Sequence, residues 1–93
     1  MLVSIRIDYC HSLYFSKPFN YPYEIFPEKG DLIFPDVLID YGMVLEESTI
    51  KDKEFMQAFE NEIFVFEKKL FTQTITQDEI NIPVIQLCFK VDE

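Results

Sequence analysis

The longest apolar, β-branched stretch of the chain is Ile80-Asn81-Ile82-Pro83-Val84-Ile85-Gln86-Leu87-Cys88-Phe89-Lys90-Val91. Alternate residues of a strand point to opposite faces of its sheet. One face of this strand is therefore wholly apolar, and the other is mixed, with Cys88 expected as a small buried residue. Such a strand is typical of the interior of a sheet. Pro83 lacks an N–H group, so it is predicted near the start of the strand or on an unpaired side.

The first half of the chain must supply partners for this strand. Residues 2–9 alternate apolar and polar, which predicts a half-buried strand followed by a short turn at residues 10–12. Residues 13–16 and 19–26 are aromatic and extended, and the prolines within and between them exclude a helix. The firmest turn is Pro27-Glu28-Lys29-Gly30-Asp31, because glycine accepts a positive φ.

The middle of the chain is less regular. Residues 32–34 are apolar, and residues 36–41 predict either a short strand or one helical turn with Val37, Leu38 and Tyr41 facing inward. Gly42 marks the next break, and residues 43–45 predict a brief strand.

Residues 52–71 support two interpretations. Phe55, Phe59, Ile63, Phe66 and Leu70 recur with the period of an amphipathic helix. However, the cluster Ile-Phe-Val-Phe at residues 63–66 favours a sheet. We predict a short helix over residues 52–60, with Asp52 as its N-cap, and then a strand over residues 62–71. One long helix over the whole segment is the alternative.

These elements predict one domain over residues 1–93, mainly β, with α+β as the alternative class. We expect a small curled antiparallel sheet, or a small barrel, of about five strands with one short helix, and a polar connection over residues 72–79. Strands of this length joined by a Gly-Asp turn, here Gly30-Asp31, resemble SH3-like barrels. That resemblance implies a fold but no function.

The chain is acidic, with a formal net charge of −9. Such a charge opposes direct binding to nucleic acid or to an anionic membrane surface, and it is compatible with a basic protein partner. The N-terminus is too short and polar for a signal peptide, and no apolar run is long enough to span a membrane. The two cysteines have no metal-binding or redox spacing. We therefore predict a cytoplasmic protein with reduced thiols and no cofactor.

Aromatic residues concentrate near the N-terminus. Six of them fall within the first 23 residues: Tyr9, Tyr14, Phe15, Phe19, Tyr21 and Tyr23. A domain this small does not need all six in its core, and tyrosine suits interfaces because one end is apolar and the other polar. We predict a partner-binding surface at Tyr14, Phe19, Tyr21 and Tyr23.

Acidic residues concentrate in the middle of the chain. Residues 24–62 hold eleven acidic residues against three lysines. Such a region can imitate the charge spacing of a nucleic-acid backbone or dock into a basic groove; the alternative is a solvated face that keeps the protein in solution. The predicted partner-binding acids are Asp36, Asp40, Glu46, Glu47, Asp52 and Glu54.

Catalytic and metal sites are not expected. Cys10 and His11 are adjacent, but neighbours on a strand point to opposite faces, and the chain has no second histidine. Asp36 and Asp40 would share one face of a helix, but they lack the glycine-bearing loop of a calcium site.

Two functions of different classes follow. The first is a small non-enzymatic protein-interaction module, either an adaptor or a dimerising accessory protein. The second is an acidic inhibitor or nucleic-acid mimic, of the kind used by a phage or mobile element against a basic host protein.

Overall fold

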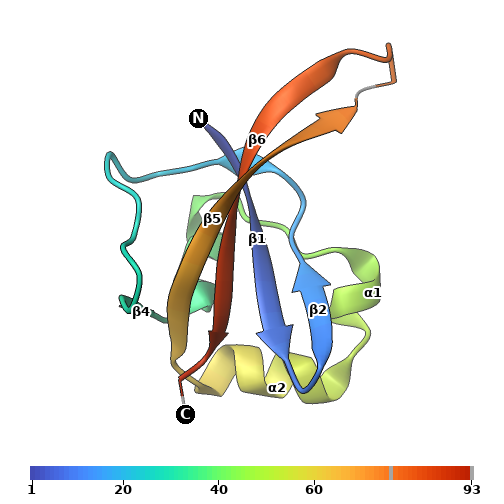
Figure 1. The fold of residues 1–93 in the computed structure, drawn as a ribbon. Coiled ribbons are helices and arrows are strands. Elements are labelled where there is room, and N and C mark those ends of the chain that lie inside the picture. The colour runs from blue at the N-terminus through green and yellow to red at the C-terminus, as the bar shows by residue number, and fades with distance from the viewer. Residues whose placement is uncertain (76, 93) are drawn as a thin grey trace.

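The computed structural model describes residues 1–75 and 77–92, which form a six-stranded mixed sheet with helical segments on one face (Figure 1). The strands are β1 (Leu2–Tyr9), β2 (Ser12–Phe15), β3 (Phe19–Asn20), β4 (Leu32–Ile33), β5 (Phe64–Ile75) and β6 (Asn81–Val91). The helical segments are the 3₁₀ helix η1 (Pro35–Tyr41) and the α-helices α1 (Glu47–Ile50) and α2 (Lys53–Asn61). The prediction of a mainly β fold is confirmed.

The predicted closing strand, β6, lies in the interior of the sheet. The strand order is β2-β1-β6-β5-β4, and β3 also pairs with β1. β6 is parallel to β1, with Val3 opposite Ile85, and antiparallel to β5. At Pro83, β6 pairs with β5 alone, because the pairing with β1 begins two residues later. The interior position and the unpaired side of Pro83 are therefore both as predicted.

The core lies between the sheet and the helices. The apolar residues of β1 and β6 stand side by side on one face of the sheet, and the helical segments add Leu38, Phe55 and Phe59 from the other side. The rings of Phe66 and Phe89 meet edge to face, with centroids 5.4 Å apart. Full burial of a side chain of this size contributes about 1.5–3 kcal/mol, so the fold depends chiefly on this face.

The other face of the sheet contains a buried cysteine, Cys88, between two basic side chains. Cys88 is only 1% exposed, as the sequence predicted. Its register partners on the two sides are Arg6 and Lys68, whose aliphatic stems can cover the thiol while their charged ends stay in water. Burial raises the pKa of the Cys88 thiol, and the nearby Arg6 and Lys68 partly oppose that shift.

The predicted change from helix to strand after α2 is confirmed, and the long helix is excluded. A carboxylate oxygen of Asp52 accepts the N–H of Phe55 at 3.0 Å, which is the expected N-cap. Glu62 is extended and ends the helix. Phe64 and Phe66 of β5 are then buried in the core, a position that only the strand geometry gives them.

Four details of the prediction are corrected. The sheet is open rather than a closed SH3-like barrel, and its β1–β6 pairing is parallel rather than antiparallel. Residues 43–45 form no strand, and Leu45 makes only an isolated bridge to Ser16. The pairing of β5 with β6 continues to Ile75 opposite Asn81, well into the expected polar connection. Thr72 and Thr74 are β-branched, which explains why this polar segment is a strand.

A fifth correction concerns the segment that forms η1. Leu38 is buried as expected, but Val37 and Tyr41 are exposed rather than inward-facing. A 3₁₀ helix has three residues per turn, so a short one presents only a narrow stripe to the core. Here Pro35 and Leu38 occupy that stripe.

The predicted turns are present. The N–H of Asp31 donates to the carbonyl of Glu28 at 2.9 Å, and Gly30 has a φ of 95°. Gly42 ends η1 with a φ of 100°. Glycine is favoured at both positions, because a Cβ makes this region of backbone conformation unfavourable.

The hairpin between β1 and β2 has an unfavourable turn sequence. Tyr9 pairs with Ser12, so Cys10 and His11 form a two-residue turn. Both have positive φ, 48° and 65°, as a type I′ turn requires. Cysteine is not favoured in the left-handed region, and although histidine adopts it more often than most side chains, asparagine followed by glycine is the preferred pair for this turn.

Replacing this turn by the preferred pair, in the double variant C10N/H11G, should stabilise the fold. We expect the free energy of unfolding to rise by about 1–2 kcal/mol, because the left-handed strain at both positions is relieved. For a domain of this size that raises the melting temperature by roughly 5–10 °C, measurable by circular dichroism. The control is Ser12→Gly in β2, which should lower stability; an unchanged melting temperature for C10N/H11G would contradict the strain argument.

Candidate functional site

A group of aromatic rings, two exposed and two half-buried against the core, lies where the segment after β3 meets the end of η1. Its members, named here the aromatic platform, are Tyr21, Tyr23, Phe26 and Tyr41. Tyr23 lies between Tyr21 and Tyr41, with ring centroids 5.6 and 5.8 Å away respectively. The rings of Tyr21 and Phe26 are stacked at 4.9 Å. Such contacts fix the rings relative to one another, so the platform is a preorganised surface.

Backbone contacts hold the platform on the sheet. The N–H of Tyr21 donates to the carbonyl of Met1 at 2.9 Å, which extends the pairing of β3 with β1. The Tyr21 hydroxyl donates to the carbonyl of Ile25 at 3.1 Å and so closes the loop that follows. Tyr41 reaches Tyr23 because Gly42 ends η1 directly after it.

The platform is amphipathic and flanked by acids. Tyr23 and Tyr41 are 45% and 51% exposed, and Ile25 beside them is 80% exposed. The exposed carboxylates of Glu24 and Asp40 directly adjoin these tyrosines in the sequence. Burial, and then the neighbouring Tyr23, raise the pKa of Tyr21, so its hydroxyl stays neutral at physiological pH. Aromatic faces beside carboxylates are the surroundings that lysine and arginine side chains prefer.

The four predicted aromatic residues do not form one surface. Tyr21 and Tyr23 belong to the platform, but Phe19 is only 7% exposed and is a core residue, which corrects its assignment to a binding surface. Tyr14 lies on β2, where its ring stacks on Phe55 of α2 at 4.0 Å. Tyr14 lies on a different strand from Phe19, and β3 ends at Asn20, so Tyr21 and Tyr23 lie in the segment that follows the strand.

The six predicted acids fall into two groups. Asp36 and Asp40 lie on η1, whereas the others lie at the ends of α1 and α2: Glu46, Glu47, Asp52 and Glu54. Glu47 forms an exposed ion pair with Lys51 at 3.3 Å. Asp52 caps α2 and also accepts the Tyr14 hydroxyl at 2.5 Å, so its carboxylate is already engaged in the fold. The remaining acids are exposed.

The strands carry the opposite charge. Four of the eight basic residues lie on the three longest strands, namely Arg6, Lys68, Lys69 and Lys90. The helical segments therefore form an acidic side of the molecule and the strands a more basic one. Lys69 also places its ammonium group 5.3 Å from the ring centroid of Phe26, so the platform already binds one cation of its own chain.

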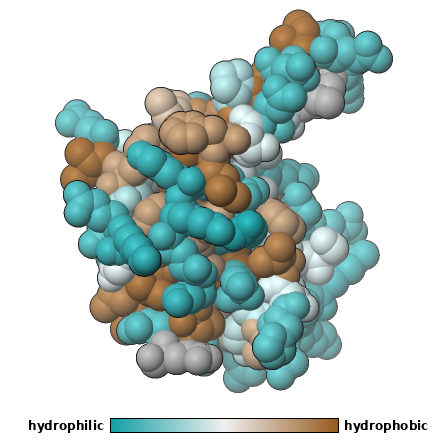
Figure 2. Space-filling view, viewed as in Figure 1, coloured by the Kyte–Doolittle hydropathy of each residue, from teal (hydrophilic) through white to brown (hydrophobic). Residues whose placement is uncertain are grey.

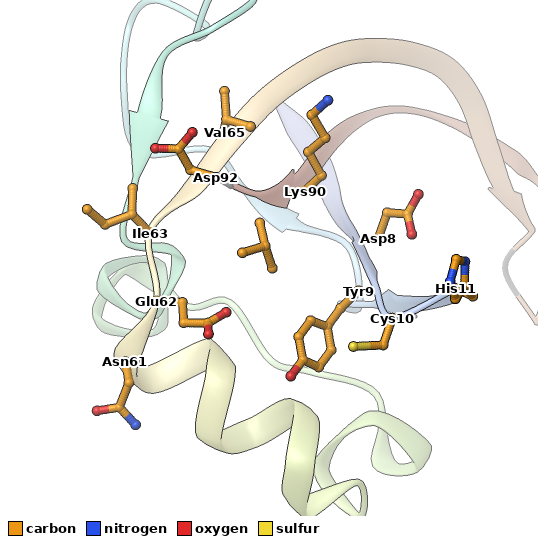
Figure 3. Close-up of a pocket in the computed structure, with 11 residues that line it drawn as sticks. Asp8, Tyr9, Cys10, His11, Asn61, Glu62, Ile63, Val65, Lys90 and Asp92 are labelled. Atoms are coloured by element: carbon orange, nitrogen blue, oxygen red, sulfur yellow. The ribbon is translucent and has the colours of Figure 1, made fainter.

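An open hollow of about 1210 Å³ lies between the β1–β2 turn and the ends of α2 and β6 (Figure 3). In Figure 3 the Cys10 thiol points toward Tyr9, whereas the His11 ring points away from the hollow. The side-chain hydrogen bond with Cys10, followed by burial, raises the pKa of Tyr9. Within residues 1–75 and 77–92, no three His, Cys, Asp or Glu side chains are grouped to hold a metal ion. In this arrangement the two side chains do not act on one atom.

Part of the platform was not predicted from the sequence. Tyr41 was expected in the interior, and Phe26 of the platform and its neighbour Ile25 were not among the predicted surface residues. The available signal was Pro22 and Pro27, which bracket these residues and keep the segment out of the sheet. No sequence feature indicated that the segment between Pro22 and Pro27 would contact η1.

Comparison with known proteins adds no identification: no family model, no curated protein and no solved structure matches the chain. Among the helices of the described residues, none has both the length and the apolar character needed to cross a membrane.

The contact between Tyr14 and Asp52 predicts a specific pH dependence. The Tyr14 hydroxyl, and then the N–H of Phe55, lower the pKa of Asp52, while the same hydrogen bond raises the pKa of Tyr14. Because the folded-state pKa of Asp52 is depressed, its contribution to stability is present above about pH 4 and is lost as the pH falls through the folded-state value. The contribution of Tyr14 is present below about pH 10 and is lost as the pH rises through its raised value.

In Tyr14→Phe we expect the pKa of Asp52 to move up toward its ordinary value, measured by NMR titration of the carboxyl carbon. Tyr23→Phe removes an exposed hydroxyl and serves as the control, with no effect on Asp52. An Asp52 titration that is the same in Tyr14→Phe and in the wild type would contradict the assigned cause.

Proposed function

We propose that this chain is a small, non-enzymatic protein-interaction module that binds a basic segment of a partner protein at the aromatic platform. The single observation that carries the proposal is the pair Tyr23 and Tyr41, in ring contact and each about half exposed, beside the carboxylates of Glu24 and Asp40. We place this interaction in the cytoplasm, where thiols such as Cys10 and Cys88 remain reduced.

The chemistry of the platform favours a cationic partner. A guanidinium or ammonium group over a tyrosine face gains about 0.5–1 kcal/mol at an exposed site. The neighbouring carboxylates add attraction, and the net charge of −9 accelerates encounter with a basic chain. The contact between Lys69 and Phe26 is an intramolecular example of the same pairing.

The test uses a nona-arginine peptide as the probe, with affinity measured by fluorescence anisotropy near physiological salt. The double variant Y23A/Y41A should bind roughly tenfold more weakly, because two cation–π contacts are lost while the net charge is unchanged. Leu13→Ala removes an equally exposed apolar side chain from β2 and is the matched control. Equal affinity of Y23A/Y41A and the wild type would rule out the platform as the binding surface.

A second function, an acidic inhibitor or nucleic-acid mimic of phage or mobile-element type, is favoured by the separation of charge. Residues 24–62, which include all three helical segments, carry −8 of the net charge of −9. The exposed Glu46, Glu47 and Glu54 lie close together in the sequence at the starts of α1 and α2. Such a side would compete with a nucleic-acid backbone for a basic protein groove.

This second function predicts that the chain releases a fluorescent DNA duplex from oligolysine at low salt. The triple variant E46Q/E47Q/E54Q should be at least about threefold less effective, and release should disappear at high salt, because exposed charges are screened. The control is E24Q/D36N/D40N, which removes the same charge elsewhere. If both triple variants lose the same amount of activity, the release of DNA depends on net charge alone. The acids of α1 and α2 then do not form a specific binding site.

A further inference from the structure

One long strand edge is open. Along one edge β5 pairs with β6, and along the other edge it pairs with β4 only at Phe64 and Val65. Backbone hydrogen bonds with Gly30 and Asp31 extend this second pairing to Phe66. Beyond the bulge between Phe66 and Lys68, no strand of the described residues pairs with this edge of β5. Residues 68–75 therefore leave about 26 Å of strand edge without a paired strand, at 3.3 Å per residue.

The outer part of this edge belongs to a projecting arm. β1 pairs with β6 only from Ile85 onward, so, within the described part of the chain, residues 72–75 and 81–84 pair as strands only with each other and form a two-stranded ribbon. Figures 1 and 2 show this ribbon standing clear of the body. A two-stranded ribbon is only marginally stable by itself in water, so an added strand would stabilise the arm.

The outer part of the open edge lacks the usual protection against pairing. Exposed strand edges are normally blocked by charged residues, by proline or by bulges. The β6 side of the arm carries Pro83, and the inner end of the β5 edge has a bulge and two lysines, but residues 70–75 of β5 hold no charge and no proline. Phe71 on this strand is 79% exposed, although its register partner Ile85 is half-buried. This segment has the chemistry of an edge that accepts another strand.

We propose that the open edge of β5 pairs antiparallel with the same edge of a second copy of this chain. The charges at the two ends of the open segment favour a second copy of the chain as the partner. Lys68 and Lys69 stand at one end of the uncharged segment, and Asp78 and Glu79 stand at the other. A two-fold axis near Gln73 pairs residues 71–75 of the two copies and brings the Lys68 end of each copy toward the turn that holds Asp78 and Glu79 of the other, so the edge is complementary to itself.

The rest of the molecule disfavours other self-contacts. The helical side is strongly acidic, and two copies meeting there would repel each other. Pairing at the β5 edge instead joins the two sheets into one and gives the exposed Phe71 of each copy a cross-strand neighbour. The inference does not rest on the aromatic platform, so either proposal can fail alone.

The test measures the association of the full chain by sedimentation velocity from about 1 to 200 µM. The wild type should shift from monomer to dimer with rising concentration. The double variant T72K/T74K adds like charges to the open edge and should remain a monomer throughout; S48K/Q57K adds the same charge to exposed helical positions and should dimerise as the wild type does. A wild type that stays monomeric at 200 µM, or a T72K/T74K variant that dimerises normally, overturns the proposal.

A charge exchange tests the antiparallel register. Lys68→Glu and Asp78→Lys should each weaken the dimer about two- to tenfold, since each affects both symmetric contacts, and the combination K68E/D78K should restore it. Failure of the combination to restore dimerisation overturns the register. If T72K/T74K does not fold, as judged by circular dichroism, hydrogen exchange is measured on the wild type instead. Protection of alternate amides in residues 68–75 that rises with protein concentration supports the proposal. Exchange that does not change with concentration overturns it.

Discussion

The parallel pairing of β1 with β6 is the constraint on which the rest of the structure depends. It places Ile5 and Ile7 beside Leu87 and Phe89 on one face, and all four side chains are about 1% exposed. The strands come from opposite ends of the chain, so their pairing encloses everything between them. Strand pairing between such distant residues has a large loop-closure cost, which burial of this apolar face must offset.

The same pairing determines which segments remain on the surface. Once β1 and β6 form the centre of the sheet, β2 and β5 flank them and the acidic middle of the chain covers one face with helices. Tyr14 of β2 then meets α2, where it stacks on Phe55 and donates to the N-cap Asp52. This contact ties the first hairpin to the helix and removes two candidate interface residues from the free surface.

The surface that results has three regions of different chemistry: the acidic helical side, the aromatic platform beside it, and the uncharged edge of β5 on the arm. The first two adjoin at η1, which contributes Asp40 to the acidic side and Tyr41 to the platform, whereas the edge of β5 comes from a separate part of the sequence. A basic partner suits the first two, whereas an uncharged strand suits the third. A protein that binds itself by one surface and a basic partner by another would present two copies of its binding surface, with the gain in apparent affinity that bivalence gives.

The sequence by itself determined the local elements. The alternation of residues 2–9, the cap at Asp52, the β-branched cluster after Glu62 and the glycine turns are short-range features, and each is found where it was predicted. The tertiary structure alone decided the parallel β1–β6 pairing, the exposure of Tyr41, the burial of Phe19 and the meeting of Tyr23 with η1. Local patterns fix φ, ψ and which side of a strand is apolar, but they do not specify which distant strand or ring lies alongside. That choice is made by the packing of the whole core, because only there do the burial energies of all segments compete.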